Sequence, residues 1–164
     1  MNKTLIAGVG NIFLGDDAFG VEVVQRLRSM RLPESVTVRD FGIRSYDLAY
    51  ALMDEWDLVI LVDAVPRGEA PGTIYTIEPE LPRNSDATGT FDAHSMNPVS
   101  VLRLVNALGG SKVKRLMLVG CEPASVEPRH DGNLGLSEPV QQAVDGAIDV
   151  IQEIIRDSEK AVAA

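Results

Sequence analysis

The chain has 164 residues, so we expect one domain that spans residues 1–164. Hydrophobic residues make up 45% of the chain and charged residues 24%, a balance typical of a protein with a packed core and not of a disordered chain. The 15 Lys and Arg residues are outnumbered by 24 Asp and Glu residues, and a net charge of −9 argues against nucleic acid and anionic membranes as partners, because such a surface repels phosphate groups.

Predicted strands and helices alternate along the chain. Strands are indicated by short apolar or alternating runs, and helices by apolar residues three and four positions apart. In chain order we predict a strand at Thr4–Gly8, a helix at Ala18–Met30, a strand at Val36–Phe41, a helix from its N-cap Ser45 through Glu55, and strands at Leu58–Val62 and Gly72–Glu78. A helix from Asn97-Pro98 to Gly109-Gly110, a strand at Leu116–Val119 and a long helix that begins at Ser137 follow. The residues of the last helix that are expected to face inward are Val140, Val144, Ile148, Ile151 and Ile155.

This order of elements predicts an α/β fold with three layers, α/β/α. Its centre is a twisted, mostly parallel sheet of five strands with helices on both faces. Only Ala64–Pro71 separates the third and fourth strands, which is too short for a helical crossover, so the fourth strand is expected to be antiparallel. The long loop Pro79–Met96 is expected to be either functional or disordered, and it can carry the chain back across the sheet; a second long loop, Glu122–Leu136, follows the last strand.

Cysteine usage and hydropathy point to the cytoplasm. Cys121 is the only cysteine, which excludes an internal disulfide and a cysteine-based zinc cluster and suits a reducing compartment. The apolar run Leu5–Gly10 faintly resembles a signal peptide, but Asn11 interrupts it and two acids follow. No apolar stretch approaches the ~18 residues that a membrane span needs.

Three kinds of polar residue are expected to meet at one edge of the sheet. Open α/β sheets bind ligands beyond the carboxyl ends of their parallel strands. Asp16 and Asp17 follow the first strand, Asp63 ends the third, and His94 lies in the returning loop. Two carboxylates and one imidazole form a ligand set with open positions that suits a divalent metal.

Each of these residues also has a purely structural interpretation. An Asp at a helix start commonly acts as an N-cap. This role would explain Asp16 but would leave Asp17 without a structural explanation. Asp63 could be a buried hydrogen-bonding residue and His94 an ordinary loop histidine. Cys121 follows an apolar strand and is expected to be an inert core residue instead of a nucleophile.

Some neighbouring residues invite further interpretations. His94 or His130 could serve as the catalytic base for a Cys121 nucleophile, and His130 is expected to be exposed. Arg44, Arg67 and Arg129 could touch a substrate. Gly20, one turn into the first helix, is expected to let that helix pack closely on the sheet.

Two other functional classes share some of these sequence features. Gly8-Val9-Gly10 after a strand suggests a dinucleotide-binding loop, but Phe13 stands where the last glycine is required. An acidic pair and a strand-ending Asp63 also suggest a receiver-like signalling domain that is phosphorylated at Asp63, yet no lysine ends the last strand and the antiparallel strand is foreign to that fold. A non-catalytic binding module of the same fold is a further alternative.

The pattern as a whole resembles the [NiFe]-hydrogenase maturation endopeptidases over nearly the entire chain. The most specific part is Gly8-Val9-Gly10-Asn11-Ile12-Phe13-Leu14-Gly15-Asp16-Asp17-Ala18-Phe19-Gly20, which is similar to the opening motif of that family. Leu61-Val62-Asp63-Ala64 matches its strand-ending aspartate, Phe91-Asp92-Ala93-His94-Ser95 its loop histidine, and Gly120-Cys121-Glu122-Pro123 its turn after the last strand. Asp17 stands where some members have Glu, and Ala18 where many have Gly.

The resemblance implies an activity and a set of site residues. It implies an endopeptidase that removes the C-terminal extension of a [NiFe]-hydrogenase large-subunit precursor after nickel insertion. The nickel is supplied by the precursor and serves for recognition, and no organic cofactor is implied. By this resemblance Asp17, Asp63 and His94 contact the metal. Our hypothesis is that Asp17 and Asp63 are also catalytic, with Asp17 the preferred general base and polarisation of the carbonyl by the metal as the alternative.

Overall fold

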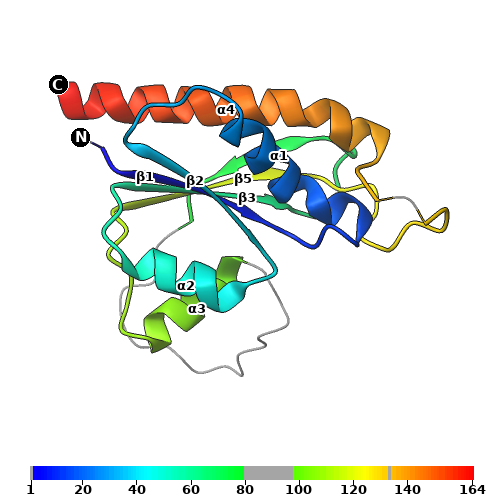
Figure 1. Cartoon of the computed structure of the whole chain (residues 1–164), viewed down its shortest axis with the longest axis horizontal. Helices are drawn as coiled ribbons and strands as arrows, with labels where there is room; N and C mark the ends of the chain where they lie inside the picture. Colours follow the sequence, from blue (N-terminus) through cyan, green and yellow to red (C-terminus); the bar gives the residue numbers. More distant parts are fainter. Residues whose placement is uncertain (1, 80–97, 133) are drawn as a thin grey trace.

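The computed structural model describes residues 2–79, 98–132 and 134–164. Apolar runs of these residues form a central sheet (Figure 1). The elements in chain order are β1 (Thr4–Val9), the short 3-10 helix η1 (Gly15–Ala18), α1 (Phe19–Arg28), β2 (Val36–Gly42), α2 (Ser45–Met53), β3 (Leu58–Ala64), β4 (Ile74–Ile77), α3 (Pro98–Ala107), β5 (Arg115–Cys121) and α4 (Glu138–Ala163).

The strand order confirms the predicted fold class. The described residues form one sheet of five strands in the order β2-β1-β3-β5-β4. β1 is parallel to β2 and to β3, and β3 is parallel to β5. β4 runs antiparallel to β5, with Ile74 opposite Cys121, as the short connection from β3 predicted. The carboxyl ends of β1, β3 and β5 therefore lie together at one edge of the sheet, at the right in Figure 1.

Two layers of helices cover the sheet, one on each face (Figure 1). α1 and α4 lie on one face, where Ile6, Ile60 and Val119 share a core with them. α2 and α3 lie on the other face, where Leu5 and Leu61 pack. Alternate residues of each strand thus face opposite layers, which is why β3 is apolar at every position but Asp63. The five α4 residues predicted to face inward are all buried.

The observed ends of some elements differ from the predicted ones. Ser45 is the first residue of α2 and not its N-cap, because the helical hydrogen bonds begin with the Leu48 N–H donating to the Arg44 carbonyl at 3.1 Å. α1 begins only at Phe19, because the preceding turn is the tighter η1. β3 extends past Asp63, which pairs with Gly120 of β5. Most of the loop predicted at Pro79–Met96 and the proposed helix start at Asn97 lie outside the described residues.

Two glycines let the start of α1 lie directly on the sheet. A Cβ on Gly20 would lie 2.0 Å from the Val62 carbonyl oxygen and 2.4 Å from that of Val9. A Cβ on Gly10, whose φ is +140°, would lie 1.8 Å from the Asp17 carbonyl oxygen. These distances leave no room for a side chain, so the predicted role of Gly20 in close packing is confirmed. The same contacts fix η1 beside the ends of β1 and β3.

We expect Gly20→Ala to destabilise the protein by about 1–3 kcal/mol, because the added methyl group must push α1 off the ends of β1 and β3. The matched control is Gly146→Ala in α4, where an added Cβ meets nothing within 4 Å and should stabilise the helix by about 0.5–1 kcal/mol. Urea unfolding of both variants measures the difference. Equal stabilities of the two variants would show that Gly20 is not needed for packing.

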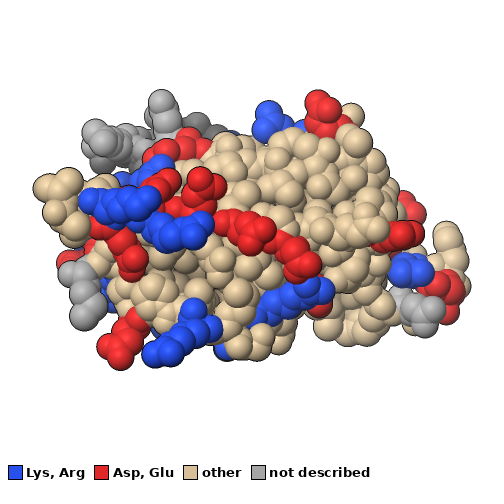
Figure 2. Space-filling model, turned by 90° about the horizontal axis from the view of Figure 1, so that it is seen from above, with Lys and Arg blue, Asp and Glu red and all other residues tan. Residues whose placement is uncertain are grey.

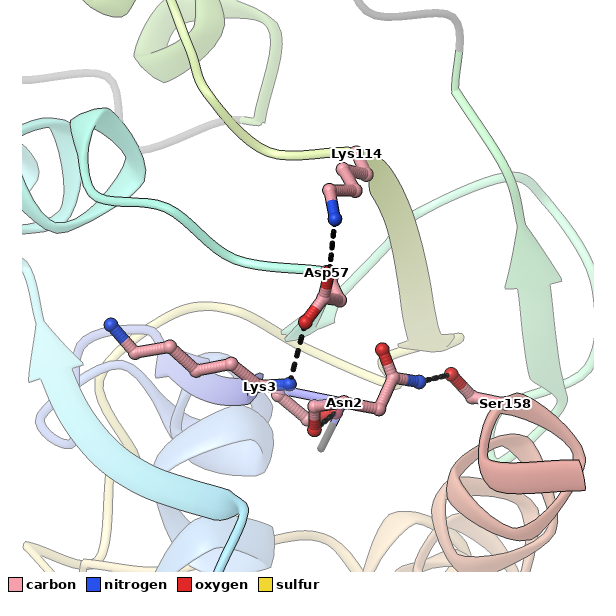
Figure 3. Close-up of polar contacts among 6 residues, drawn as sticks. Asn2, Lys3, Asp57, Lys114 and Ser158 are labelled. Atoms are coloured by element: carbon pink, nitrogen blue, oxygen red, sulfur yellow. Dashed lines mark hydrogen bonds and ion pairs between the residues drawn. The ribbon is translucent and has the colours of Figure 1, made fainter. Parts of the chain in front are cut away.

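A polar clamp joins the amino ends of three strands at the opposite edge (Figure 3). The Asp57 carboxylate before β3 accepts a hydrogen bond from the Lys3 backbone N–H at 2.8 Å and pairs with the Lys114 ammonium at 2.6 Å. The hydrogen bond from Lys114 is the main cause that lowers the pKa of Asp57. The Asn2 side chain donates to the Ser158 hydroxyl and so ties the chain start to α4. A pocket lined by Lys3, Trp56, Asp57 and Lys114 lies here, far along the strands from the predicted site.

Most of the acidic excess belongs to exposed surface. Seen from the α4 side, acidic and basic side chains gather together toward the end where α4 finishes, and a broad area toward the other end shows few charges (Figure 2). Glu153, Asp157 and Glu159 on α4 are all exposed. None of the helices in residues 2–79, 98–132 and 134–164 is long and apolar enough to cross a membrane.

Candidate functional site

Asp17 and Asp63 meet at the carboxyl edge of the sheet, as predicted. Asp17 lies in η1, directly after the β1 loop, and Asp63 lies near the end of the neighbouring strand β3. The Asp17 carboxylate accepts a hydrogen bond from the Asn11 backbone N–H at 2.8 Å, which fixes its orientation. The two carboxyl groups are close enough for the charge of Asp17 to act on Asp63.

The surroundings of Asp63 favour its neutral form. Its side chain belongs to a strand that is buried along its whole length, and only 6% of the residue is exposed. Burial raises the pKa of Asp63 well above its ordinary value of 3.8, and the charge of Asp17 raises this pKa further, while the Ala64 backbone N–H opposes the shift. A buried acid beside a second acid is costly to ionise, so this pair is an unusual choice for a purely structural role.

The pair suits a cation. A divalent ion placed between two carboxylates removes their mutual repulsion and favours the ionised form of both. Carboxylate oxygens are ligands for hard and borderline metals. The third predicted ligand, His94, lies outside the described residues, and within the described part of the chain no three His, Cys, Asp or Glu side chains gather as a metal site.

Asp16 has a different role from its neighbour Asp17. It is 1% exposed, and its carboxylate accepts hydrogen bonds from the Ala124 N–H at 2.8 Å and the Ser125 N–H at 3.3 Å. It also accepts the Ser137 N–H at 2.6 Å and the Ser137 hydroxyl at 2.8 Å, directly before α4. The N-cap interpretation of Asp16 is therefore wrong for its own helix. The carboxylate instead sits at the N-terminus of α4, where the helix dipole favours a negative charge.

Glu122 organises the loop that follows Asp63, a role that the sequence interpretation missed. Glu122 is a buried residue. Its carboxylate accepts hydrogen bonds from the Arg67 N–H at 2.8 Å, the Gly68 N–H at 3.1 Å and the Tyr75 hydroxyl at 2.5 Å. The hydrogen bond from Tyr75 is the largest cause that lowers the pKa of Glu122, and burial raises the pKa of Tyr75 to about 12. An acid placed directly after a buried strand was the available signal, the same one that marked Asp63.

We expect Glu122→Gln to lower the stability of the protein at pH 7, because the loop loses a charged acceptor for three donors. Because folding lowers the pKa of Glu122, its ionised form stabilises the protein at pH values above the unfolded-state pKa of about 4.5. This stabilisation is lost as the pH falls through the folded-state pKa. The deficit of the variant should therefore shrink below pH ~4. Thermal unfolding at pH 7 and pH 3.5, with Tyr75→Phe as the milder companion, measures it. A deficit that is the same at both pH values would contradict this role.

Cys121 and His130 do not form a nucleophilic pair. Cys121 is fully buried, and burial raises the pKa of its thiol to about 12, so the thiol stays protonated and unreactive at neutral pH. His130 is exposed in the loop after β5. The interpretation of Cys121 as an inert core residue is confirmed.

The three arginines that could touch a substrate are exposed and already engaged within the chain. Arg44 donates to the Phe41 and Asp40 carbonyls at the end of β2. Arg67 lies over the Tyr75 ring with 5.2 Å between the guanidinium carbon and the ring centroid. Arg129 pairs with Asp131 at 2.9 Å. Contact of any of them with a substrate stays a prediction.

Comparison with known proteins gives a consistent result. A family model described as hydrogenase maturation protease matches residues 21–154. A putative hydrogenase maturation protease of Methanocaldococcus jannaschii is 38% identical over 150 residues, which cover 90% of this chain and 92% of that protein. The hydrogenase 2 maturation protease of Escherichia coli is 30% identical over 158 residues, 95% of this chain and 92% of that protein. The solved structure of the hydrogenase maturating endopeptidase HybD from E. coli has a TM-score of 0.74 at 31% identity, with 96% of this chain and 94% of that chain covered.

Proposed function

The chain belongs to the hydrogenase maturation protease family and is a peptidase, and on that premise we propose that it removes a C-terminal extension from a [NiFe]-hydrogenase large-subunit precursor after nickel has been inserted. The observation that carries this proposal is the pair Asp17 and Asp63, held by two adjacent parallel strands at the edge where α/β folds bind ligands.

In this proposal nickel arrives as part of the substrate. Asp17 and Asp63 supply carboxylate oxygens, and His94 supplies an imidazole nitrogen to the open positions of the ion. The buried Cys121 offers no thiolate, so this chain holds the ion only through oxygen and nitrogen and releases it with the product. The raised pKa of Asp63 supports the scheme, because burial and the charge of Asp17 both disfavour its ionised form and a bound cation offsets both effects.

Hydrolysis then requires a base and a positioned water. The Asp17 carboxylate, oriented by the Asn11 N–H, takes a proton from water while the water oxygen bonds to the scissile carbonyl carbon. The carbon–nitrogen bond then breaks, and the proton that Asp17 took from water passes to the departing nitrogen, so that the products are an amine and a carboxylic acid and Asp17 is ionised again. Polarisation of the carbonyl oxygen by the substrate's nickel is the alternative way to make the carbon reactive.

The acidic surface and the reduced cysteine agree with the setting that this function needs. With a net charge of −9, nucleic acid is not a partner in this proposal, and neither is an anionic membrane. The free thiol of Cys121 fits a reducing cytoplasm, where we place the reaction.

The proposal is tested by incubating the protein with nickel-loaded precursor and measuring the intact mass of the products. We expect one new C-terminus and one released peptide, with no other cut. An unrelated unfolded protein serves as the control substrate and should stay intact. His94→Ala should lose the activity. A precursor that keeps its full mass, or that is cut at many bonds, would refute the proposed function.

A further inference from the structure

Several large apolar side chains are exposed on two loops beside the Asp17–Asp63 pair. Phe13 is 63% exposed and Ile12 43% exposed in the loop after β1, and Ile43 is 61% exposed in the loop after β2. Because β1 and β2 are parallel neighbours, both loops leave the sheet at its carboxyl edge. The Gly10 N–H donates to the Gly42 carbonyl at 3.0 Å, so the two loops lie side by side. We call Ile12, Phe13 and Ile43 the apolar rim.

The backbone of the apolar rim is held in place. The Asn11 side-chain oxygen accepts the Phe13 N–H at 2.9 Å, and the Asn11 carbonyl accepts the Leu14 N–H at 3.1 Å. In the other loop the Ile43 carbonyl accepts the Ser45 N–H at 3.0 Å. The rim is thus a prepared surface, and binding to it requires little ordering of its backbone.

The part of the apolar rim that lies in the loop after β1 adjoins the catalytic pair. Asn11 links the two directly, since its N–H donates to the Asp17 carboxylate and its side chain holds Phe13. A polypeptide rises about 3.3 Å per residue when extended, so a chain whose scissile bond lies at Asp17 reaches Phe13 within a few residues. Exposed large apolar groups beside a polar site commonly mark an interaction surface.

Resting on the proposed function, we propose that the apolar rim binds apolar side chains of the precursor within a few residues of the bond that is cut. This contact positions the polypeptide over Asp17 and Asp63 and makes Phe13 and Ile43 determinants of substrate specificity. The nickel ion then identifies a completed precursor, and the rim recognises the sequence around the scissile bond. A second copy of this chain is the competing occupant, but a copy seated on the rim would block the adjoining pair.

The test compares the cleavage kinetics of Phe13→Ser and Ile43→Ser with those of Val162→Ser. Val162 is 62% exposed, but it lies in the last turn of α4 at the other end of the molecule (Figure 1), so its variant controls for the loss of an exposed apolar group. We expect KM for nickel-loaded precursor to rise about 10- to 100-fold in each rim variant, because each loses the burial of a large apolar group. The kcat and Tm should match those of Val162→Ser.

Three outcomes separate this inference from the proposed function. A wild-type protein that does not cut the precursor refutes the proposed function, and the rim's role as a substrate contact is refuted with it. Rim variants that cut with the KM of the control refute the rim alone. If sedimentation shows that the wild type is a dimer and that Phe13→Ser is a monomer with unchanged KM, the rim serves self-association. This result also overturns the inference.

Discussion

Asp17→Asn and Asp63→Asn should each lower the rate of precursor cleavage by about 100- to 10,000-fold, the usual contribution of a group that transfers a proton or holds a reacting centre. The two variants keep the shape of the side chain and remove its charge. Asp17→Asn also keeps an oxygen that can accept the Asn11 N–H, so the loop after β1 should stay in place. Single-turnover cleavage of nickel-loaded precursor measures the loss.

The same Asp63→Asn variant should be more stable than the wild type at neutral pH. Because the pKa of Asp63 is raised on folding, the folded state binds this proton more tightly than the unfolded state. Wild-type stability therefore falls as pH rises from about 3.8 through the folded value, and the variant escapes this loss. Its Tm should exceed that of the wild type at pH 8 and approach it near pH 3.5.

The exposed Asp149 on α4 provides the matched control for this experiment. Asp149→Asn should change neither the cleavage rate nor the pH dependence of Tm. A lower Tm of Asp63→Asn at every pH would mean that Asp63 holds the fold together, and its activity loss would then be explained by structure alone. Loss of activity combined with a gain in stability is the signature of a residue kept for function.

Asp16→Ala should produce the largest loss of stability among single substitutions at this edge, about 3 kcal/mol, because it removes the buried acceptor of four hydrogen bonds. The donors come from the segment between β5 and α4, so this segment should become susceptible to proteolysis before the rest of the chain. Urea unfolding measures the loss, and limited proteolysis with mass analysis locates it.

Asp16→Asn is the graded comparison for this second prediction. Its amide keeps one acceptor oxygen, so its stability should lie between those of the wild type and Asp16→Ala. At temperatures where it is folded, it should cut the precursor far faster than Asp17→Asn, although the two positions are adjacent. Equal stability of Asp16→Ala and wild type would contradict the proposal that Asp16 holds the segment between β5 and α4 in place. A lower cleavage rate in folded Asp16→Asn than in Asp17→Asn would reverse the roles assigned to the two acids.

Sequence pattern predicted the sheet well because burial determines it directly. The continuous apolar run of β3 could only be a central strand, and the short connection Ala64–Pro71 could only lead to an antiparallel neighbour. The helix starts were less accurate. At Ser45 a favourable capping residue was present, but the backbone placed Arg44 in the capping position, since the hydrogen bonds of the first turn depend on how the chain leaves β2.

The site could be predicted only in part, for a physical reason. Asp17 and Asp63 follow neighbouring parallel strands, and strand order brings such residues together without any knowledge of side-chain contacts. The partners of Asp16 and Glu122 lie in other segments, 108 to 121 and 47 to 55 positions away along the chain, and no local pattern encodes them. The apolar rim was missed because exposure is a property of the folded surface.

The measurement that tests the central claim most directly is the ratio of kcat/KM for nickel-loaded precursor to that for nickel-free precursor. If Asp17 and Asp63 bind the nickel of the substrate, this ratio should be at least about 10 for the wild type. A tenfold ratio corresponds to a coupling free energy of about 1.4 kcal/mol, which is a moderate value. It should fall toward one in Asp63→Asn, where the coupled carboxylate is missing. Undiminished cleavage of the nickel-free precursor by the wild type would contradict the account.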